Sequence, residues 1–216
     1  MLDFGCGSLR AGKLYIPYLN CGNYYGQEPN QWLIDDGVQN ELGQGIADAK
    51  KPNFSNRDDF KVGFDYKFDY VVAQSIFSHT DIHLTRKGLK SIVSALKPTG
   101  IALVTIVEGE DYIGDDSWVY PECTTHSQKT IVKLLNESGG YWRRLWWFHP
   151  AQTWFAITTS KESLPSVYDN FFLLGGEEIG SKQYKKQRFL ANRMYSLYKM
   201  TKSIKIINHL YKRLRR

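Results

Sequence analysis

Continuous apolar runs and segments with helical spacing alternate along the first 160 residues of the chain. Residues 68–73 (FDYVVA) and 101–107 (IALVTIV) are nearly continuous and rich in β-branched residues, as parallel strands buried on both faces are. Shorter apolar segments predict five further strands, at residues 1–4, 23–28, 54–60, 141–148 and 153–159. Helical spacing predicts helices at residues 9–19, 32–42, 82–96 and 125–136.

This alternation of strands and helices predicts an α/β fold. We expect a doubly wound, mostly parallel sheet of seven strands, in which the last two strands form an antiparallel pair. Ligands of such sheets bind at the carboxyl ends of the strands. The functional residues are therefore expected in the segments that directly follow strands.

The character of the chain changes near residue 160. Twelve of the 28 Lys and Arg residues lie in the stretch that begins at Lys182 and ends at Arg216, which holds none of the 22 acids. Apolar residues recur there at helical spacing from Leu190 to Leu214, which predicts a basic amphipathic helix. We expect two parts, a domain over residues 1–160 and a basic helical extension over residues 161–216.

Composition narrows the class of protein. With 42% hydrophobic and 14% aromatic residues among 216, the chain can bury a core. No apolar run approaches the ~20 residues of a membrane span, and no signal-peptide pattern opens the chain. The three cysteines show no metal-ligand spacing. These features predict a cytoplasmic protein without a metal site.

The first strand leads into a glycine turn, LDFGCGSLRAG at residues 2–12. Gly5 and Gly7 allow positive φ angles and leave no Cβ in the way of a ligand. The following helix directs its free N–H groups and the positive end of its dipole toward this turn. Asp3 lies two residues before the turn, where a carboxylate could contact a cationic ligand or hold the loop.

An acid follows the second strand, because the segment YYGQEPN at residues 24–30 contains Glu28, 23 positions after Gly5. Nucleotide-binding βαβ units place at about this spacing the acid that accepts hydrogen bonds from the ribose hydroxyls. The alternative is an acid favoured by the dipole at a helix N-terminus. The third glycine of a dinucleotide fingerprint is absent, since position 10 is Arg10, and this argues against a dehydrogenase that uses NAD.

Together the segments LDFGCGSLRAG, YYGQEPN and FDYVVAQSIFSHT (residues 68–80) resemble the class I methyltransferases that use S-adenosylmethionine. The resemblance implies a Rossmann-like fold, S-adenosylmethionine as the cofactor and methyl transfer as the reaction. Members of this family usually carry a helix before the first strand, whereas Met1 stands directly against that strand here. We therefore expect that the N-terminus of the sequence is truncated or mis-assigned.

The resemblance also implies the cofactor residues, by position. The methionine part would lie against the glycine turn and the end of the fourth strand, the ribose against the acid after the second strand, and the adenine against an acid and an apolar residue after the third. These residues are Asp3, Gly5, Cys6, Gly7 and Gln74 for the methionine part, Glu28 for the ribose, and Asp59 and Phe60 for the adenine. For Asp59 and Phe60 the alternative is an ordinary polar loop with one core aromatic residue.

Methyl transfer from a sulfonium is an in-line displacement, so alignment of the reactants supplies much of the catalysis, and a hydroxyl acceptor also benefits from a general base. His79 follows the fourth strand and His126 follows the acidic loop after the fifth, so both are candidate catalytic bases at the rim of the sheet. Each has a structural alternative, a partner of a helix cap for His79 and a surface helix residue for His126.

The loop after the fifth strand carries acids and aromatic residues. Its acids at residues 108–116 could bind Mg²⁺, but their spacing matches no ligand pattern, and we interpret the loop as a solvated segment near the substrate. Six aromatic residues could stack on a planar substrate or a sugar, although most of them lie at strand positions and are expected in the core. They are Trp118, Tyr120, Trp142, Trp146, Trp147 and Trp154.

These features predict S-adenosylmethionine-dependent methylation, with O-methylation of a small molecule or a cell-surface glycan precursor as the leading hypothesis. A protein that binds the cofactor without catalysis and a nucleic-acid methyltransferase are the alternatives. Nucleic acid is disfavoured as a partner because residues 1–181 hold 16 basic residues against 22 acids, and because the chain reads AQSIF where a base-flipping motif would stand. The basic extension instead predicts peripheral attachment to an anionic membrane surface at the inner face.

Overall fold

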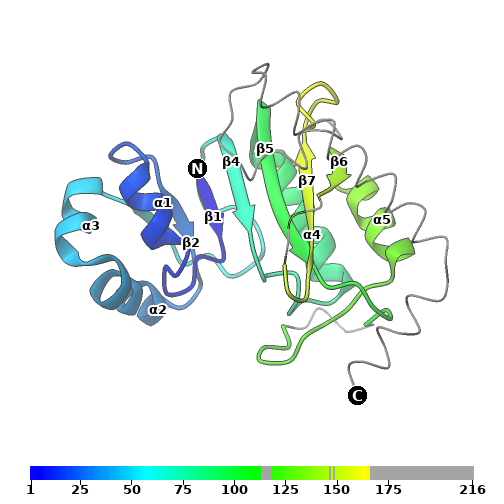
Figure 1. Ribbon diagram of the computed structural model, residues 1–216, viewed down its shortest axis with the longest axis horizontal. Coiled ribbons are helices and arrows are strands. Elements are labelled where there is room, and N and C mark those ends of the chain that lie inside the picture. The colour runs from blue at the N-terminus through cyan, green and yellow to red at the C-terminus, as the bar shows by residue number, and fades with distance from the viewer. Residues whose placement is uncertain (113–117, 146, 148, 166–216) are drawn as a thin grey trace, which may run out of the picture. The chain divides into compact units, whose positions relative to one another are not determined.

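The computed structural model describes residues 1–112, 118–145, 147 and 149–165 (Figure 1). The chain divides into a compact unit, Met1–Leu164, and a second unit, Pro165–Arg216. The amphipathic helix predicted from Leu190 to Leu214 lies outside the described residues.

The described residues form a seven-stranded sheet in the order β3-β2-β1-β4-β5-β7-β6, which confirms the predicted doubly wound fold. The first five strands are parallel neighbours, and β7 pairs antiparallel with both β5 and β6. The strands are β1 Leu2–Phe4, β2 Tyr25–Gln27, β3 Asn53–Ser55, β4 Phe68–Ala73, β5 Leu96–Ile106, β6 Tyr141–Arg144 and β7 Thr153–Thr158. Strand order reverses between β1 and β4, which is the point where ligands bind to sheets of this kind.

The helices lie in the connections between these strands. They are α1 Gly12–Tyr18, α2 Gln31–Asp36, the π-helix η1 Gly37–Leu42, α3 Gln44–Lys50, α4 Ile82–Ala95 and α5 Gln128–Glu137. Figure 1 shows α1, α2 and α3 beside β2, and α4 and α5 beside the strands from β4 to β6. Asp81 and Ser127 begin α4 and α5 as side-chain caps, accepting from the backbone N–H groups of Leu84 and Thr130 at 2.8 and 3.2 Å.

The predicted helix over residues 32–42 is in fact α2 followed by the wider turn of η1. The reason is a close approach of backbones. A Cβ placed on Gly37, the first residue of η1, would lie 2.6 Å from the backbone carbonyl group of Ser8 in the glycine turn. Periodicity alone could not predict this contact.

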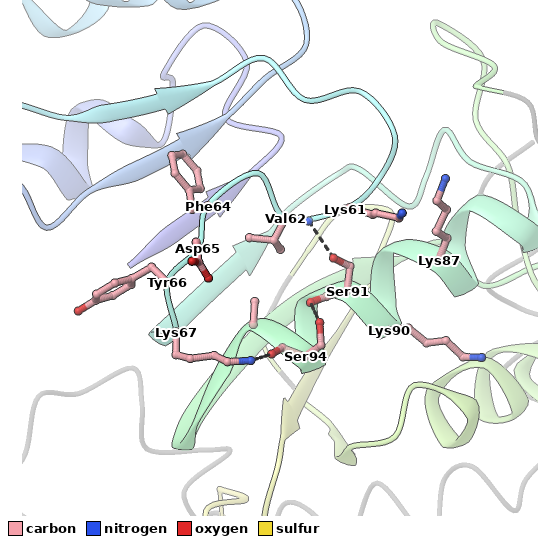
Figure 2. A pocket seen from close by; sticks show the side chains of 11 residues that line it. Lys61, Val62, Phe64, Asp65, Tyr66, Lys67, Lys87, Lys90, Ser91 and Ser94 are labelled. Atoms are coloured by element: carbon pink, nitrogen blue, oxygen red, sulfur yellow. Dashed lines mark hydrogen bonds between the residues drawn. The ribbon is translucent and has the colours of Figure 1, made fainter.

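The connection from β3 to β4 contains no helix. The third strand, predicted over residues 54–60, is only Asn53–Ser55, and the chain then runs as a loop along one side of α4 (Figure 2). The backbone N–H of Val62 in this loop donates to Ser91 Oγ of α4 at 2.8 Å. We call residues 56–67 the β3–β4 loop.

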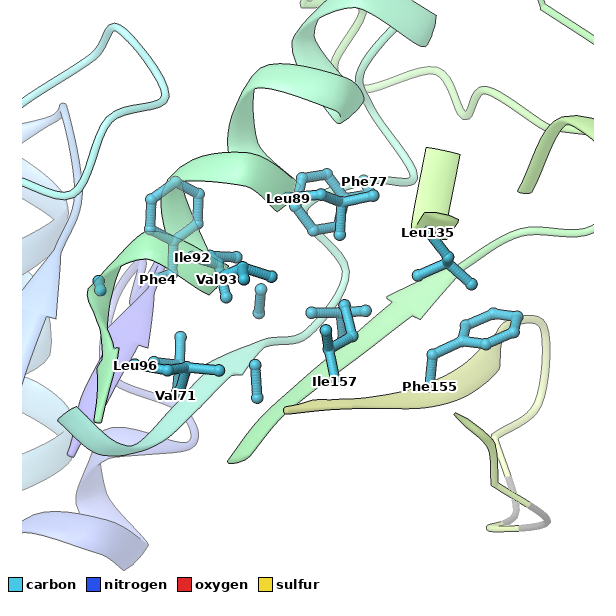
Figure 3. Close-up of a cluster of buried hydrophobic side chains, with 14 of the residues drawn as sticks. Phe4, Val71, Phe77, Leu89, Ile92, Val93, Leu96, Leu135, Phe155 and Ile157 are labelled. Atoms are coloured by element: carbon cyan, nitrogen blue, oxygen red, sulfur yellow. The ribbon is translucent and has the colours of Figure 1, made fainter. Parts of the chain in front are cut away.

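Two hydrophobic clusters are packed against the sheet. The larger one lies between the sheet and α4 and α5, and Figure 3 shows Phe4, Val71, Leu89, Leu135 and Phe155 within it. The smaller one joins the start of α1 to β2 and to the helices before β3, and contains Cys6, Leu9, Ile16, Tyr24, Leu42 and Ala47. None of the described helices is both long enough and apolar enough to cross a membrane.

Candidate cofactor site

The glycine turn between β1 and α1 is fixed against the end of β2. The backbone N–H groups of Gly5 and Cys6 both donate to the carbonyl oxygen of Gln27, at 2.8 and 3.0 Å. Gly5 and Gly7 have φ angles of 82° and 51°, as the sequence predicts for a tight turn. A Cβ on Gly7 would meet no atom within 4 Å, so this side of the turn is open to a ligand.

Glu28 lies at the end of β2 and faces the turn. Its carboxylate accepts from the backbone N–H of Gly7 at 3.3 Å and from the backbone and side-chain nitrogens of Asn30 at 3.0 and 2.9 Å. The residue is only 8% exposed, so these three hydrogen bonds fix its orientation. A carboxylate offers about four acceptor positions, which leaves room for a further donor such as a hydroxyl.

A pocket of about 270 Å³ opens at the carboxyl ends of β1 and β2. It is lined by Phe4, Gly5, Gln27, Glu28, Pro29, Asn30, Arg57, Asp58, Phe60, Ile76 and Trp118. Three of the residues assigned to the cofactor, Gly5, Glu28 and Phe60, therefore come together, although they are as many as 55 positions apart in the sequence. Ile76 closes the pocket beside the turn, since a Cβ on Gly5 would lie 2.0 Å from its Cδ1 atom.

Asp3 and Cys6 lie behind the turn and do not line the pocket. Asp3 is buried and accepts a hydrogen bond from the Tyr24 hydroxyl at 2.8 Å. Burial raises the pKa of the Asp3 carboxyl to about 6, against a smaller opposing effect of that hydrogen bond. Burial likewise raises the pKa of the Cys6 thiol, so Cys6 is an uncharged packing residue. The Tyr24 hydroxyl ties Asp3 to the residue before β2, and the assignment of Asp3 to the methionine part stays a prediction.

The side chain of Asp59 is directed to the Arg57 guanidinium, with Oδ1–Nε and Oδ2–Nη2 distances of 2.6 and 2.9 Å. The Arg57 hydrogen bonds lower the pKa of the Asp59 carboxyl below its usual range. The residue that lines the pocket is Asp58, one position earlier. Gln74, at the end of β4, is exposed and is not among the lining residues.

Gln27 is a site residue that the sequence analysis missed. Its side-chain nitrogen donates to the carbonyl oxygens of Arg57 and Lys61 at 3.2 and 2.9 Å, and its side-chain oxygen accepts from the Gly63 N–H at 2.9 Å. Gln27 is buried, and these bonds hold the part of the β3–β4 loop that forms one wall of the pocket. Its position immediately before Glu28 was the only indication of this role in the sequence.

His79 follows β4 and lies beside two aromatic rings near the pocket. Its Nδ1 atom is 2.7 Å from the carbonyl oxygen of Glu122. A carbonyl oxygen can only accept, so Nδ1 carries the proton and Nε2 keeps the lone pair of the neutral ring. The ring centroids of Trp118 and Tyr120 lie 5.4 and 5.2 Å from that of His79.

His126 has a different environment, because its side chain is fully buried at 0% exposure. Burial lowers the pKa of its imidazole, opposed by the nearby carboxylate of Asp111, which favours a neutral ring. The sequence predicted an exposed position for His126, on the rim or on a surface helix. In this conformation the imidazole ring cannot be reached by a substrate that accepts the methyl group.

The acidic loop has structural roles in its described part, which extends to Tyr112. Asp111 accepts from the backbone N–H of Ser127 at 2.6 Å and from the Thr130 hydroxyl at 2.8 Å, and so supports the start of α5. Glu108 forms an ion pair with Arg144 at 3.0 Å. Within the described ranges, no group of three or more His, Cys, Asp or Glu side chains could hold a metal ion.

Residues 2–102 match a protein family described as a methyltransferase domain. The structure of magnesium protoporphyrin IX methyltransferase from Synechocystis PCC 6803 with bound S-adenosylmethionine is similar, with a TM-score of 0.54 and 15% identity over 73% of this chain and 68% of that one. An S-adenosylmethionine-dependent methyltransferase from Clostridium acetobutylicum ATCC 824 has a TM-score of 0.56 and 14% identity, over 74% of this chain and 83% of that one. A glycopeptide N-methyltransferase with S-adenosyl-L-homocysteine has a TM-score of 0.56 and 12% identity, over 74% of this chain and 80% of that one.

Among curated proteins, none matches the chain by sequence. At identities of 12 to 15%, the likeness to these structures shows the fold of this chain and not its substrate. The family match covers every residue that lines the pocket except Trp118. The pocket therefore lies almost wholly within the matched range, whereas Trp118 and Tyr120 beside His79 lie beyond it.

Proposed function

We propose that this chain, which belongs to the class I methyltransferases that use S-adenosylmethionine, methylates a hydroxyl group of a small molecule or of a cell-surface glycan precursor. The observation that carries the proposal is the position of His79, whose Nδ1 faces the Glu122 carbonyl oxygen and whose ring lies beside Tyr120 and Trp118, the latter also a lining residue of the cofactor pocket.

The pocket fits S-adenosylmethionine, which supplies the electrophilic methyl group when it is bound. Glu28 is oriented at the end of β2 with a free acceptor position for the ribose hydroxyls. Phe60 offers an apolar surface to the adenine, and the open side of Gly7 admits the methionine part. In this arrangement Asp58 is nearer to the adenine than Asp59, and Asp3 and Cys6 support the turn from behind.

His79 is the candidate base. Its Nδ1–H is held by the Glu122 carbonyl oxygen, so Nε2 is the atom that can accept the hydroxyl proton as the oxygen–carbon bond forms. His126, which the sequence also suggested, could take this role only if the loop that encloses it opened.

Trp118 and Tyr120 are the candidate acceptor surface. The two residues are 48% and 67% exposed. Their rings are nearly parallel, with an angle of 19° between the ring planes and 6.5 Å between the centroids. Exposed aromatic faces bind flat rings and the apolar faces of sugars. Since Trp118 also lines the cofactor pocket, an acceptor stacked here would lie next to the bound cofactor.

The twelve basic residues of the extension lie in its part from residue 182 to residue 216, and from here on the name basic extension refers to this part. We further propose that it attaches the enzyme peripherally to the inner face of a membrane, where such precursors would be accessible.

The function is tested by incubating the full chain with S-adenosylmethionine and a set of phenolic and sugar acceptors. We expect S-adenosylhomocysteine to form together with a product one methyl group heavier, in which nuclear magnetic resonance places the methyl on oxygen. A methyl on nitrogen would contradict the O-methylation proposal. Tight cofactor binding with no product from any acceptor or cell extract would favour the alternative of a binding protein without catalysis.

A further inference from the structure

A second hollow, of about 790 Å³, lies between the β3–β4 loop and α4. Its lining residues are Lys61, Val62, Phe64, Asp65, Tyr66, Lys67, Lys87, Lys90, Ser91, Ser94 and Ala95. We call it the lysine groove (Figure 2). The groove begins where the cofactor pocket ends, since Phe60 lines the pocket and Lys61 lines the groove.

The lining of the groove carries a net positive charge. It contains four lysines and one acid, Asp65. In the part of the chain that the structure describes, Lys61, Lys87 and Lys90 form no ion pair with a carboxylate. Lys67 donates to the carbonyl oxygen of Ser94 and so closes one end of the groove.

The two α4 lysines face the groove because of helical spacing. Lys87 and Lys90 are three positions apart, and Ser91 and Ser94 follow on the same face. Ser91 Oγ accepts from Val62 N–H, and its hydroxyl can donate at the same time to an oxygen of a ligand. Ammonium and hydroxyl groups together suit an anion with several oxygens, such as a phosphate.

An apolar wall faces the lysines. It consists of Val62, Phe64 and Tyr66 of the loop with Ala95 of α4. Phe64 packs edge to face on Tyr25 at 5.1 Å and Tyr66 stacks on the same ring at 5.5 Å, so the wall is held in place by the core of the domain. The groove therefore offers both an anion site and an apolar surface, the combination that an amphiphilic ligand requires.

A nucleic acid duplex would use the lysines and leave the apolar wall without a role, and a single strand would need aromatic faces on which its bases can stack. Tyr66 is already stacked on Tyr25, and the Lys97 ammonium lies 5.6 Å from its ring centroid. An anionic membrane uses the lysines and the apolar wall, and it also attracts the twelve basic residues of residues 182–216. The groove and the extension are both positively charged, so an anionic membrane is complementary in charge to each of them.

We propose that the lysine groove binds the phosphate headgroup of an anionic phospholipid at a membrane surface. This site goes beyond the methyl transfer reaction, because none of its residues lines the cofactor pocket or contacts His79.

The test is lysine acetylation of the full chain, followed residue by residue with mass spectrometry, because this readout separates the groove from the basic extension. With vesicles that contain phosphatidylglycerol we expect acetylation of Lys61, Lys87 and Lys90 to slow several-fold. Vesicles of phosphatidylcholine alone should leave these rates unchanged. Lys51, which is exposed at the end of α3, serves as the internal control.

A matched pair of variants gives the second measurement. Lys87→Gln with Lys90→Gln is compared with Lys129→Gln with Lys133→Gln, which makes the same charge change on α5, outside the groove. We expect the α4 pair to weaken binding to phosphatidylglycerol vesicles roughly fivefold per lysine at low salt, and the α5 pair to have less than half that effect. Both variants should keep the helical circular dichroism and the cofactor affinity of the parent chain.

Equal acetylation rates with and without anionic vesicles would overturn the proposal. So would protection by soluble glycerol phosphate without protection by vesicles, because the groove would then be a site for a free phosphate compound. Equal losses of vesicle binding in the two double variants would show a general charge effect and would also contradict it. These outcomes are independent of methyl transfer, so the groove can fail while the proposed function stands.

Discussion

At the scale of single residues, Glu28 is the residue on which the proposed binding of the ribose depends. It holds the Gly7 N–H and both nitrogens of Asn30, and it keeps an acceptor position for a ribose hydroxyl. We expect Glu28→Gln to lower the affinity for S-adenosylmethionine by about ten- to hundredfold, because charge-assisted hydrogen bonds contribute about 1.5–3 kcal/mol. Calorimetry decides this, with Glu41→Gln as a control that removes only a surface ion pair. An unchanged affinity would remove Glu28 from the site.

His79 is the residue on which the proposed chemistry depends. Replacement by Gln removes the Nε2 lone pair, so we expect turnover to fall by about 10²–10⁴-fold while the affinity for the cofactor is retained. His83→Gln is the matched control, since His83 is an exposed histidine four positions later on α4. Normal turnover of His79→Gln would exclude the base role and favour an acceptor that needs no base.

Asp3 gives a prediction on pH and stability. Burial raises the pKa of its carboxyl to about 6, from an ordinary value of 3.8, so the folded chain holds a proton there that the unfolded chain has lost. The free energy of unfolding should therefore fall as pH rises from about 4 to 6, by up to about 3 kcal/mol from this group. Asp3→Asn can still accept from Tyr24 and should lack this part of the slope. Urea unfolding at several pH values measures it, and identical slopes in both chains would contradict the prediction.

Which site residues the sequence could predict follows from how each is positioned. Gly5 and Glu28 directly follow β1 and β2, so strand order alone brings them to the same pocket. Phe60 lies five residues after the end of β3 and reaches the pocket through the conformation of the β3–β4 loop. The choice of Asp58 over Asp59, and the role of Gln27, depend on hydrogen bonds inside the β3–β4 loop that no spacing encodes. The burial of His126 arises because its backbone pairs with Val107, which folds the loop back on the sheet.

At the scale of elements, the β3–β4 loop shapes both the cofactor pocket and the lysine groove, and β2 holds it through Gln27. Strand β4 agrees with its predicted bounds of Phe68–Ala73. Its last three residues, Val71–Ala73, are buried on both faces and form the continuous apolar run that the sequence shows, whereas Asp69 and Tyr70 are exposed. The conformation of the loop could not be predicted in this way, since backbone N–H and carbonyl groups of the loop form hydrogen bonds with Gln27, a buried side chain of β2. Its conformation is a tertiary property.

Gln27→Leu tests this arrangement. It removes three hydrogen bonds to the loop at nearly constant volume and leaves their backbone partners unsatisfied. We expect faster amide hydrogen exchange over residues 57–63 and at least a tenfold loss of cofactor affinity, because Arg57, Asp58 and Phe60 form a wall of the pocket. Gln31→Leu, which breaks only an exposed pair with Asp35, is the control. Unchanged exchange of the loop would show that Gln27 does not hold it.

At the scale of the whole molecule, the distribution of charge separates two tasks. Residues 1–181 carry 16 basic residues against 22 acids, whereas residues 182–216 carry twelve basic residues and no acid. A net negative domain is repelled by an anionic surface except at local positive sites such as the lysine groove. The strength of membrane attachment should therefore come from the basic extension, and the groove should determine which face of the domain meets the lipid.

This division predicts the relative effects of changes in the two parts. Deletion of residues 182–216 should weaken sedimentation with phosphatidylglycerol vesicles far more than Lys87→Gln with Lys90→Gln, because twelve charges are lost instead of two. Binding of the full chain should also fall as salt is raised from about 0.05 to 0.5 M, since the Debye length shortens to a few ångströms. The shortened chain needs a control for folding, which cofactor calorimetry provides. If the full chain fails to sediment with anionic vesicles even at low salt, both the attachment through the extension and the role of the groove are wrong. If the shortened chain sediments as well as the full one, the domain itself carries the attachment and the basic extension has another partner.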